Sequence, residues 1–180
     1  MATTSFIPRL ICLIGLIGYR LPDRHLLATT AQQKVVAIAT SQLHVRESGR
    51  NNFGKEIKAY LAYTRLPEGN PYCAAFISWV FAKAGYTEPR TAWSPDLFPA
   101  ARCIKEPQAA DLLAIYSVEK KRIAHCGLIE RLQHDWVIAI EGNTNIEGSR
   151  EGDGVYRKWR HRRTIYSYSR WLKREEVQHD

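Results

Sequence analysis

The sequence predicts an α+β domain in which helices come first and an antiparallel β-sheet follows. In the first half of the chain, apolar residues recur at helical spacing. In the second half, short runs rich in β-branched and aromatic residues are separated by turn residues at hairpin spacing. The 180 residues show no repeats, and 45% are apolar and 24% charged, as in a globular domain. This order of elements is typical of one α+β domain.

Three helices are expected in the first half. The helical pattern begins at Thr30, whose hydroxyl can cap the first helix. A second helix is expected over residues 55–63, and Pro67 prevents its continuation. A third is expected over residues 73–84, with Gly85 as its natural C-terminal stop.

The second half predicts five β-strands after a proline-containing loop at residues 93–107. Turn residues separate the strands, most clearly at 133–135 and 148–154. The spacing predicts hairpins, and hence an antiparallel sheet. The expected strands are 111–118, 123–132, 136–142, 155–159 and 164–168.

Residues 1–30 are expected to be an N-terminal extension, 31–174 the domain, and 175–180 a tail. The apolar run 10–19 is too short to span a bilayer, so no stable membrane span is expected. Its length fits a signal-peptide core, which would export the protein to the periplasm or cell exterior. The alternative is a short packed helix or a misplaced start codon, and the protein would then stay in the cytoplasm until it is released.

Positive charge is concentrated near the C-terminus. The formal net charge is +8, and residues 155–174 hold eight basic residues and no acidic one. Such a segment attracts polyanions. Its mixture of aromatic and basic side chains also suits a nucleic-acid-binding module without catalysis, although a solvated strand is the simpler interpretation and no nucleic-acid partner is expected. The candidate polyanion patch consists of Arg157, Lys158, Arg160, Arg162 and Arg163.

Four cysteines stand at positions 12, 73, 103 and 126, and none forms a CxxC pair. This spacing predicts neither a zinc site nor a dense disulfide framework. Free thiols are expected, with one structural disulfide left open. Cys126 and Cys103 are expected to be core residues.

Cys73 begins the third predicted helix. The first turn of a helix has unpaired backbone N–H groups and the positive end of the dipole, and both stabilise a thiolate. The same N–H groups can hold the oxyanion that forms when a carbonyl is attacked. Cys73 is therefore a candidate nucleophile, and the alternative is a buried structural cysteine.

A nucleophilic cysteine needs a base and a group that orients the base. If the turn centres at 133–135, register counting places His125 opposite Glu141, with Cβ atoms about 5 Å apart. Glu141 or Asn143 can then orient the imidazole, although Asn143 also fits a simple turn. On the same strand face we expect small or apolar residues that pack under the Cys73 helix: Gly127, Ile129, Val137 and Ala139.

These motifs resemble the CHAP family, the cysteine, histidine-dependent amidohydrolases and peptidases. The resemblance is carried by Cys73 followed by Ala-Ala-Phe-Ile-Ser-Trp-Val, by His125-Cys-Gly, and by Glu141-Gly-Asn143, and it covers roughly residues 32–171. It implies a papain-like fold, with the nucleophile at a helix N-terminus packed on the sheet. It also implies that Cys73 is the nucleophile, His125 the base and Glu141 its orienting acid, with Asn143 near the oxyanion.

The resemblance implies hydrolysis of amide bonds in peptidoglycan, by an endopeptidase or an N-acetylmuramoyl-L-alanine amidase. An acyltransferase could use the same Cys–His pair, because cleft shape and water access choose the acceptor. Tyr72 is expected to assist at the oxyanion, and Trp93 is either a cleft aromatic or a core residue. Some phage members bind calcium through an acidic loop. Here residues 46–52 contain only one acid, so we expect no metal or other cofactor, and a monomeric enzyme with peptidoglycan as its partner.

Overall fold

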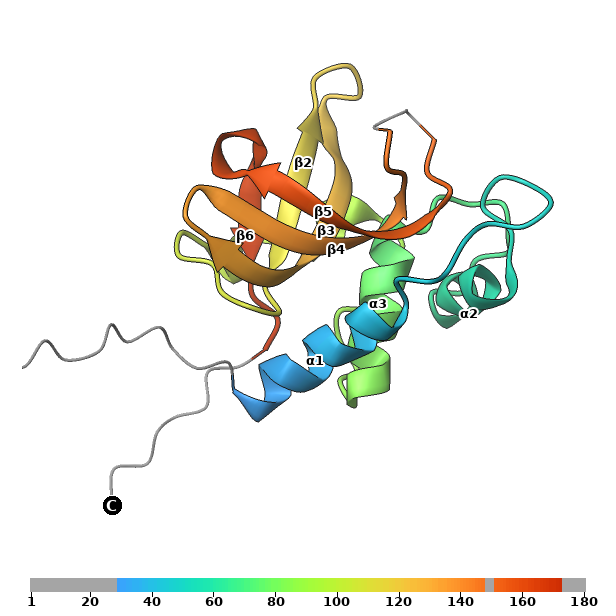
Figure 1. The fold of residues 1–180 in the computed structure, drawn as a ribbon, viewed down its shortest axis with the longest axis horizontal. Helices are drawn as coiled ribbons and strands as arrows, with labels where there is room; N and C mark the ends of the chain where they lie inside the picture. The colour runs from blue at the N-terminus through green and yellow to red at the C-terminus, as the bar shows by residue number, and fades with distance from the viewer. Residues whose placement is uncertain (1–28, 148–150, 173–180) are drawn as a thin grey trace, which may run out of the picture.

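The computed structural model describes residues 29–147 and 151–172. The chain forms α-helices, short 3-10 helices (η) and one β-sheet (Figure 1). In chain order these are α1 (Thr30–Ser41), α2 (Lys55–Tyr63), α3 (Cys73–Ala84), η1 (Ser94–Leu97), η2 (Ala100–Arg102), β1 (Cys103–Ile104), β2 (Leu112–Ser117), β3 (Arg122–Gln133), β4 (Trp136–Thr144), β5 (Gly154–His161), η3 (Arg162–Thr164) and β6 (Ser167–Ser169).

The three helices begin and end where local chemistry favours it. Thr29, and not Thr30, caps α1 through a reciprocal pair of hydrogen bonds with Gln32. Helices α2 and α3 have the expected bounds. Gly85 ends α3 in the left-handed conformation, with φ of 101°. Helix α3 is almost entirely buried, which is why its sequence is apolar on most faces.

The sheet is antiparallel, and its strand order is β1-β6-β2-β3-β4-β5. The α+β prediction is therefore confirmed. All five predicted strands exist, but the last is shorter than expected because η3 occupies its beginning. The predicted loop 93–107 contains η1, η2 and the short edge strand β1.

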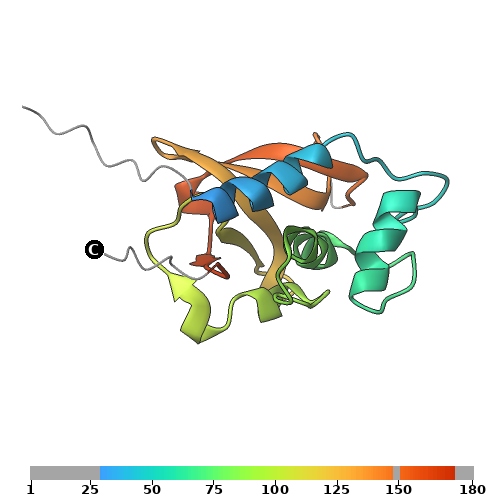
Figure 2. The same cartoon turned by 90° about the horizontal axis from the view of Figure 1, so that it is seen from below.

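Helices α1 and α3 pack on one face of the sheet, and α2 packs against α3 (Figures 1 and 2). The main core lies between them and includes Phe76 of α3, Leu112 of β2, Leu128 of β3 and Ile140 of β4. Seen from below, α1 runs along the sheet and α3 is viewed almost end-on beside it (Figure 2). This packing holds the N-terminal end of α3 against the middle strands.

One expectation about this core is wrong. Gly127 lies against Glu141, and Ile129, Val137 and Ala139 form a second, smaller cluster with Leu113, separate from the cluster that contains α3. Side chains alternate between the two faces of a strand, so Leu128 and Ile140 face the helices and their neighbours do not. The expected set was assigned to the wrong face.

The predicted extension at 1–30 and the predicted tail at 175–180 lie outside the described residues, apart from Thr29 and Thr30. Within residues 29–147 and 151–172, no helix is both long and apolar enough to cross a bilayer.

Candidate active site

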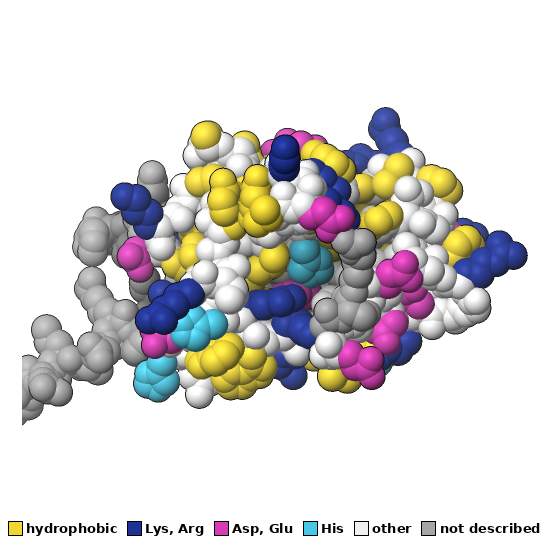
Figure 3. Space-filling view, turned by 90° about the horizontal axis from the view of Figure 1, so that it is seen from above, with side chains coloured by type: hydrophobic (Ala, Val, Ile, Leu, Met, Phe, Trp, Pro, Cys, Tyr) yellow, Lys and Arg dark blue, Asp and Glu magenta, His cyan; other side chains and the backbone are white. Residues whose placement is uncertain are grey.

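Cys73 is the first residue of α3 and lies at the edge of a cavity of about 590 Å³. Its side chain is almost buried, with 6% of the residue surface exposed. The Cys73 Sγ is 3.3 Å from the hydroxyl of Ser94, the first residue of η1. His125 and Asn143 line the same cavity, so the structure brings these predicted site residues together. The space-filling view shows a histidine and basic side chains near the middle of one molecular face (Figure 3).

His125 and Glu141 are in contact, but not in the register we expected. The His125 Nε2 lies 2.8 Å from Glu141 Oε2. Leu128 pairs with Ile140, and a register shift follows at Ile129 and Arg131. Continuing the Leu128 pairing by one residue places Gly127, and not His125, opposite Glu141.

Glu141 therefore reaches His125 diagonally, across the position of Gly127. A Cβ atom added to Gly127 would lie 2.7 Å from Glu141 Cγ, too close for any real side chain. The glycine leaves the space through which the carboxylate reaches the imidazole. The contact was predicted correctly, and the geometry behind it was not.

Arg160 is a site residue that the sequence analysis placed elsewhere. From β5 its Nε donates to Glu141 Oε1 at 2.8 Å, and its Nη2 donates to Glu141 Oε2 at 2.6 Å. Glu141 is fully buried, so this two-point ion pair supplies the charge that its carboxylate needs. The alternation of side chains between the two sheet faces could have indicated this role. Arg160 pairs with Val137, which lies on the same sheet face as Glu141, so Arg160 shares that face.

The charges of these groups are strongly coupled. Burial alone would raise the pKa of Glu141, but hydrogen bonds from Arg160 and the charge of His125 lower it to about 2. Burial alone would lower the pKa of His125, but the charge of Glu141 and hydrogen bonding with Cys73 and Glu141 raise it to about 10. At neutral pH the site therefore contains a carboxylate and an imidazolium.

The Cys73 thiol has its own neighbours. The pKa of Cys73 lies well below its ordinary value in spite of burial. Hydrogen bonding with Cys126 lowers it most, followed by hydrogen bonding with His125, the positive charge of His125 and hydrogen bonding with Ser94. Burial and the neighbouring Cys73 sulfur raise the pKa of Cys126. Of the two thiols, Cys73 is therefore the one that loses its proton more readily.

Cys126 is buried, as expected for a core residue, yet it also contacts the candidate nucleophile. Sequence reasoning missed this contact because residues adjacent on a strand point to opposite faces. Cys103 is exposed, so the expectation that it is a core residue is wrong. The three described cysteines, Cys73, Cys103 and Cys126, are free thiols.

Asn143 lines the cavity but does not hold the imidazole. Its side-chain amide donates to the side-chain oxygen of Asn52, and its backbone adopts a positive φ of 55°. Asparagine tolerates this left-handed conformation better than most residues. Glu141 alone of the two predicted candidates contacts the His125 ring.

The Tyr72 side chain is fully buried beside Tyr60, with ring centroids 6.2 Å apart, and is not part of the cavity wall. Burial and the nearby carboxylate of Glu47 raise the pKa of Tyr72, so its phenol stays neutral. A side-chain role for Tyr72 at the oxyanion is therefore not supported. Its backbone carbonyl accepts a hydrogen bond from Phe76 N in the first turn of α3.

Trp93 is 48% exposed, so the core role considered for it is wrong. The guanidinium carbon of Arg122 lies 4.0 Å from the centre of the Trp93 ring. Arg122 lines the cavity, and Trp93 directly precedes Ser94. Trp93 therefore lies beside the site and contacts it through Arg122.

The basic segment does not form a single free patch. Arg157 donates two hydrogen bonds of 2.7 Å to Glu130, and Arg160 is paired with Glu141. The Lys158 ammonium donates to the carbonyl of Asn145 at 2.5 Å. The remaining two patch residues are exposed in η3, where Arg162 donates to the carbonyl of His134 and Arg163 donates its backbone N–H to His161.

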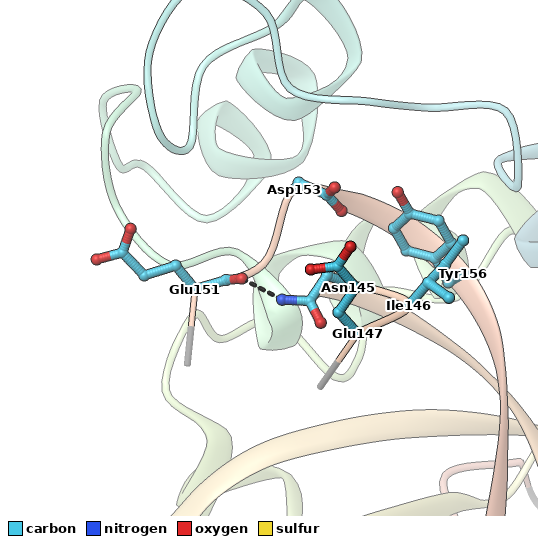
Figure 4. Close-up of a pocket in the computed structure, with 6 residues that line it drawn as sticks. All are labelled: Asn145, Ile146, Glu147, Glu151, Asp153 and Tyr156. Atoms are coloured by element: carbon cyan, nitrogen blue, oxygen red, sulfur yellow. Dashed lines mark hydrogen bonds between the residues drawn. The ribbon is translucent and has the colours of Figure 1, made fainter. Parts of the chain in front are cut away.

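A second cavity of about 260 Å³ lies where β4 leads into β5 (Figure 4). The side-chain amide of Asn145 donates to the carbonyl of Glu151, drawn as a dashed line. Glu151 also lines the larger cavity, so this bond helps to position one wall of the candidate site. Among the described residues, no group of three or more His, Cys, Asp or Glu side chains is arranged to hold a metal ion.

No protein-family model matches the sequence, and no curated protein matches it. Two solved structures resemble it in part: the crystal structure of Ly7917 and the crystal structure of Ly7917 with the hydrolyzing product of MDP. Sequence identity is 15% in both, with TM-scores of 0.44 and 0.43. The matches cover 76% of this chain, which spans only 60% and 61% of the matched chains. Similarity at this level assigns no function.

Proposed function

We propose that the protein is a cysteine amidohydrolase of papain-like fold that cleaves amide bonds in peptidoglycan. The observation that carries the proposal is the connected array of Cys73, His125 and Glu141 at one cavity. Perturbed pKa values together with a nucleophile, a base and an orienting acid are the features expected of a catalytic site. The identity of the substrate comes from the resemblance of these motifs to the CHAP family.

The geometry supports the following reaction. His125 Nε2 is hydrogen-bonded to Glu141, which leaves Nδ1 to hold the proton given up by Cys73, and the shifted pKa values favour a thiolate beside an imidazolium before substrate binds. The thiolate attacks the amide carbonyl carbon, and the resulting oxyanion is held by the backbone N–H of Cys73 at the start of α3. The imidazolium gives its proton to the leaving nitrogen as the C–N bond breaks. Water, deprotonated by His125, then releases the acid from the thioester.

The basic segment favours this enzyme proposal over a pure binding module. Two of its cations, Arg157 and Arg160, are neutralised by carboxylates. Arg160 in particular donates a hydrogen bond to the buried carboxylate of Glu141. A surface that binds polyanions without catalysis would not need a buried carboxylate and imidazole behind it.

The direct test is release of muropeptides from purified peptidoglycan, followed by mass spectrometry. Cys73→Ala is expected to lower the rate by at least about a thousandfold, because the variant lacks the thiolate that forms the acyl-enzyme. Cys103→Ala is the matched control: its thiol is exposed and outside the cavity, so the variant should keep the full rate. New free amino groups on stem or bridge residues identify an endopeptidase, and peptides freed from glycan identify an amidase. Full activity of the Cys73→Ala variant would rule out this mechanism.

A further inference from the structure

Four lysine and arginine side chains line the cavity, and they differ in what they are hydrogen-bonded to. Arg160 is bonded to Glu141 through two hydrogen bonds. Lys158 donates to two backbone carbonyls at the end of β4, those of Asn145 and Ile146. The remaining two are Lys120, at the turn between β2 and β3, and Arg122, at the start of β3.

Arg122 is held in place and still has donors to offer. Its guanidinium stacks 4.0 Å above the Trp93 ring, and its Nη1 donates to the carbonyl of Ile123 at 3.0 Å. Within residues 29–147 and 151–172, no carboxylate forms an ion pair with Arg122. A guanidinium has several N–H donors, so one bond to a carbonyl leaves the others for a ligand. Lys120 is exposed and flexible by comparison.

The position of Arg122 can be related to Cys73 Sγ, the reacting sulfur, through its neighbours Trp93 and His125. Trp93 precedes Ser94, whose hydroxyl is 3.3 Å from Cys73 Sγ. Arg122 lies three residues before His125 on β3, about 10 Å along an extended strand. An extended peptide bound in the cavity therefore reaches Arg122 within a few residues of the bond at Cys73.

We propose that Arg122, held against the Trp93 ring, forms a subsite that binds a single carboxylate of the substrate near the scissile amide. A guanidinium fork matches a carboxylate in two parallel hydrogen bonds. Glu119 and Glu151 also line the cavity, so its lining carries side chains of both charge signs. The inference deepens the proposed function, because it names an acidic residue near the cleaved bond as a feature of the substrate.

The test measures binding rather than catalysis, on the full chain carrying Cys73→Ala. The peptides acetyl-Ala-Glu-Ala-amide and acetyl-Ala-Gln-Ala-amide differ only in one carboxylate, and their Kd values are obtained by NMR titration. The Glu peptide is expected to bind about tenfold more tightly, the size of one charge-assisted contact. Adding Arg122→Gln should abolish that preference, and Arg122→Lys should keep only part of it.

Arg102→Gln is the matched control, since Arg102 also stacks on a tryptophan, Trp171, but lies outside the cavity. It should leave the preference intact. Equal binding of the two peptides overturns the proposal, and so does a preference that survives Arg122→Gln. Failure to cleave peptidoglycan would instead refute the proposed function, because the peptide binding ratio does not depend on Cys73.

Discussion

Two arginines of β5 make similar contacts but should differ greatly in how much they contribute to the stability of the protein. Arg157 and Arg160 each hold a glutamate through two hydrogen bonds. Glu141 has no exposed side-chain surface, whereas the Arg157 pair with Glu130 reaches solvent. Removing one member of a buried pair leaves an uncompensated charge, and removing an exposed partner does not.

We therefore expect Arg160→Gln to destabilise the protein by about 3 kcal/mol, measured by urea unfolding at pH 7. The same substitution at Arg157 should cost less than about 1 kcal/mol. Equal losses of stability in the two variants would contradict the assignment of Arg160 to the site.

At this scale the sequence was a good guide to which residue types matter. Cys73, His125 and Glu141 were predicted from a helix start and a hairpin, and the structure places them in one connected array. Arg160 was predicted only as surface charge, and Cys126 only as a core residue. The role of Arg160 was misjudged and the contact of Cys126 with Cys73 was missed, because both depend on neighbours from other elements.

The pairing of β3 with β4 determines how the site elements meet. The register places the Glu141 side chain over Gly127, and a methyl group there would overlap Glu141 Cγ. We expect Gly127→Ala to cost about 2 kcal/mol and to displace the carboxylate from His125. The rate of peptidoglycan cleavage should fall by about a hundredfold, mostly in kcat, because the imidazole loses its orienting partner.

Gly85→Ala provides the comparison. It should cost about 1 kcal/mol, because alanine is strained at the positive φ that ends α3. Gly85 lies at the opposite end of α3 from Cys73, so the cleavage rate should not change. If Gly127→Ala loses stability but keeps full kcat, Glu141 does not reach His125 through this gap.

The whole molecule should respond to acid through its buried carboxylate. The folded state lowers the pKa of Glu141 from 4.5 to about 2, because Arg160 and His125 favour its charged form over the effect of burial. As the pH falls, the unfolded chain therefore binds a proton at Glu141 at a higher pH than the folded protein does. Stability from Glu141 is complete above about pH 4.5 and is lost as the pH falls toward 2, on the order of 3 kcal/mol in all.

Urea unfolding of the wild type and of Glu141→Gln, at pH 7, 4.5 and 3, checks this expectation. The other carboxylates titrate in both proteins, so the difference between them isolates Glu141. Between pH 4.5 and pH 3 that difference should shrink, because Glu141 is then protonated in the unfolded wild type before it is protonated in the folded one. A difference that stays the same at pH 3 would show that Glu141 keeps an ordinary pKa.

The sequence by itself determined the class of fold, the bounds of α2 and α3, and the residues at the centre of the candidate site. These follow from local chemistry: helical periodicity, a glycine cap, strand alternation and the position of a cysteine at a helix start. Only the tertiary structure decided which face of the sheet meets the helices, that Glu141 crosses Gly127, and that Arg160, Cys126 and Ser94 surround the reacting groups. Strand register and the pairing of distant segments decide these, because a shift of one residue moves every side chain to the opposite face.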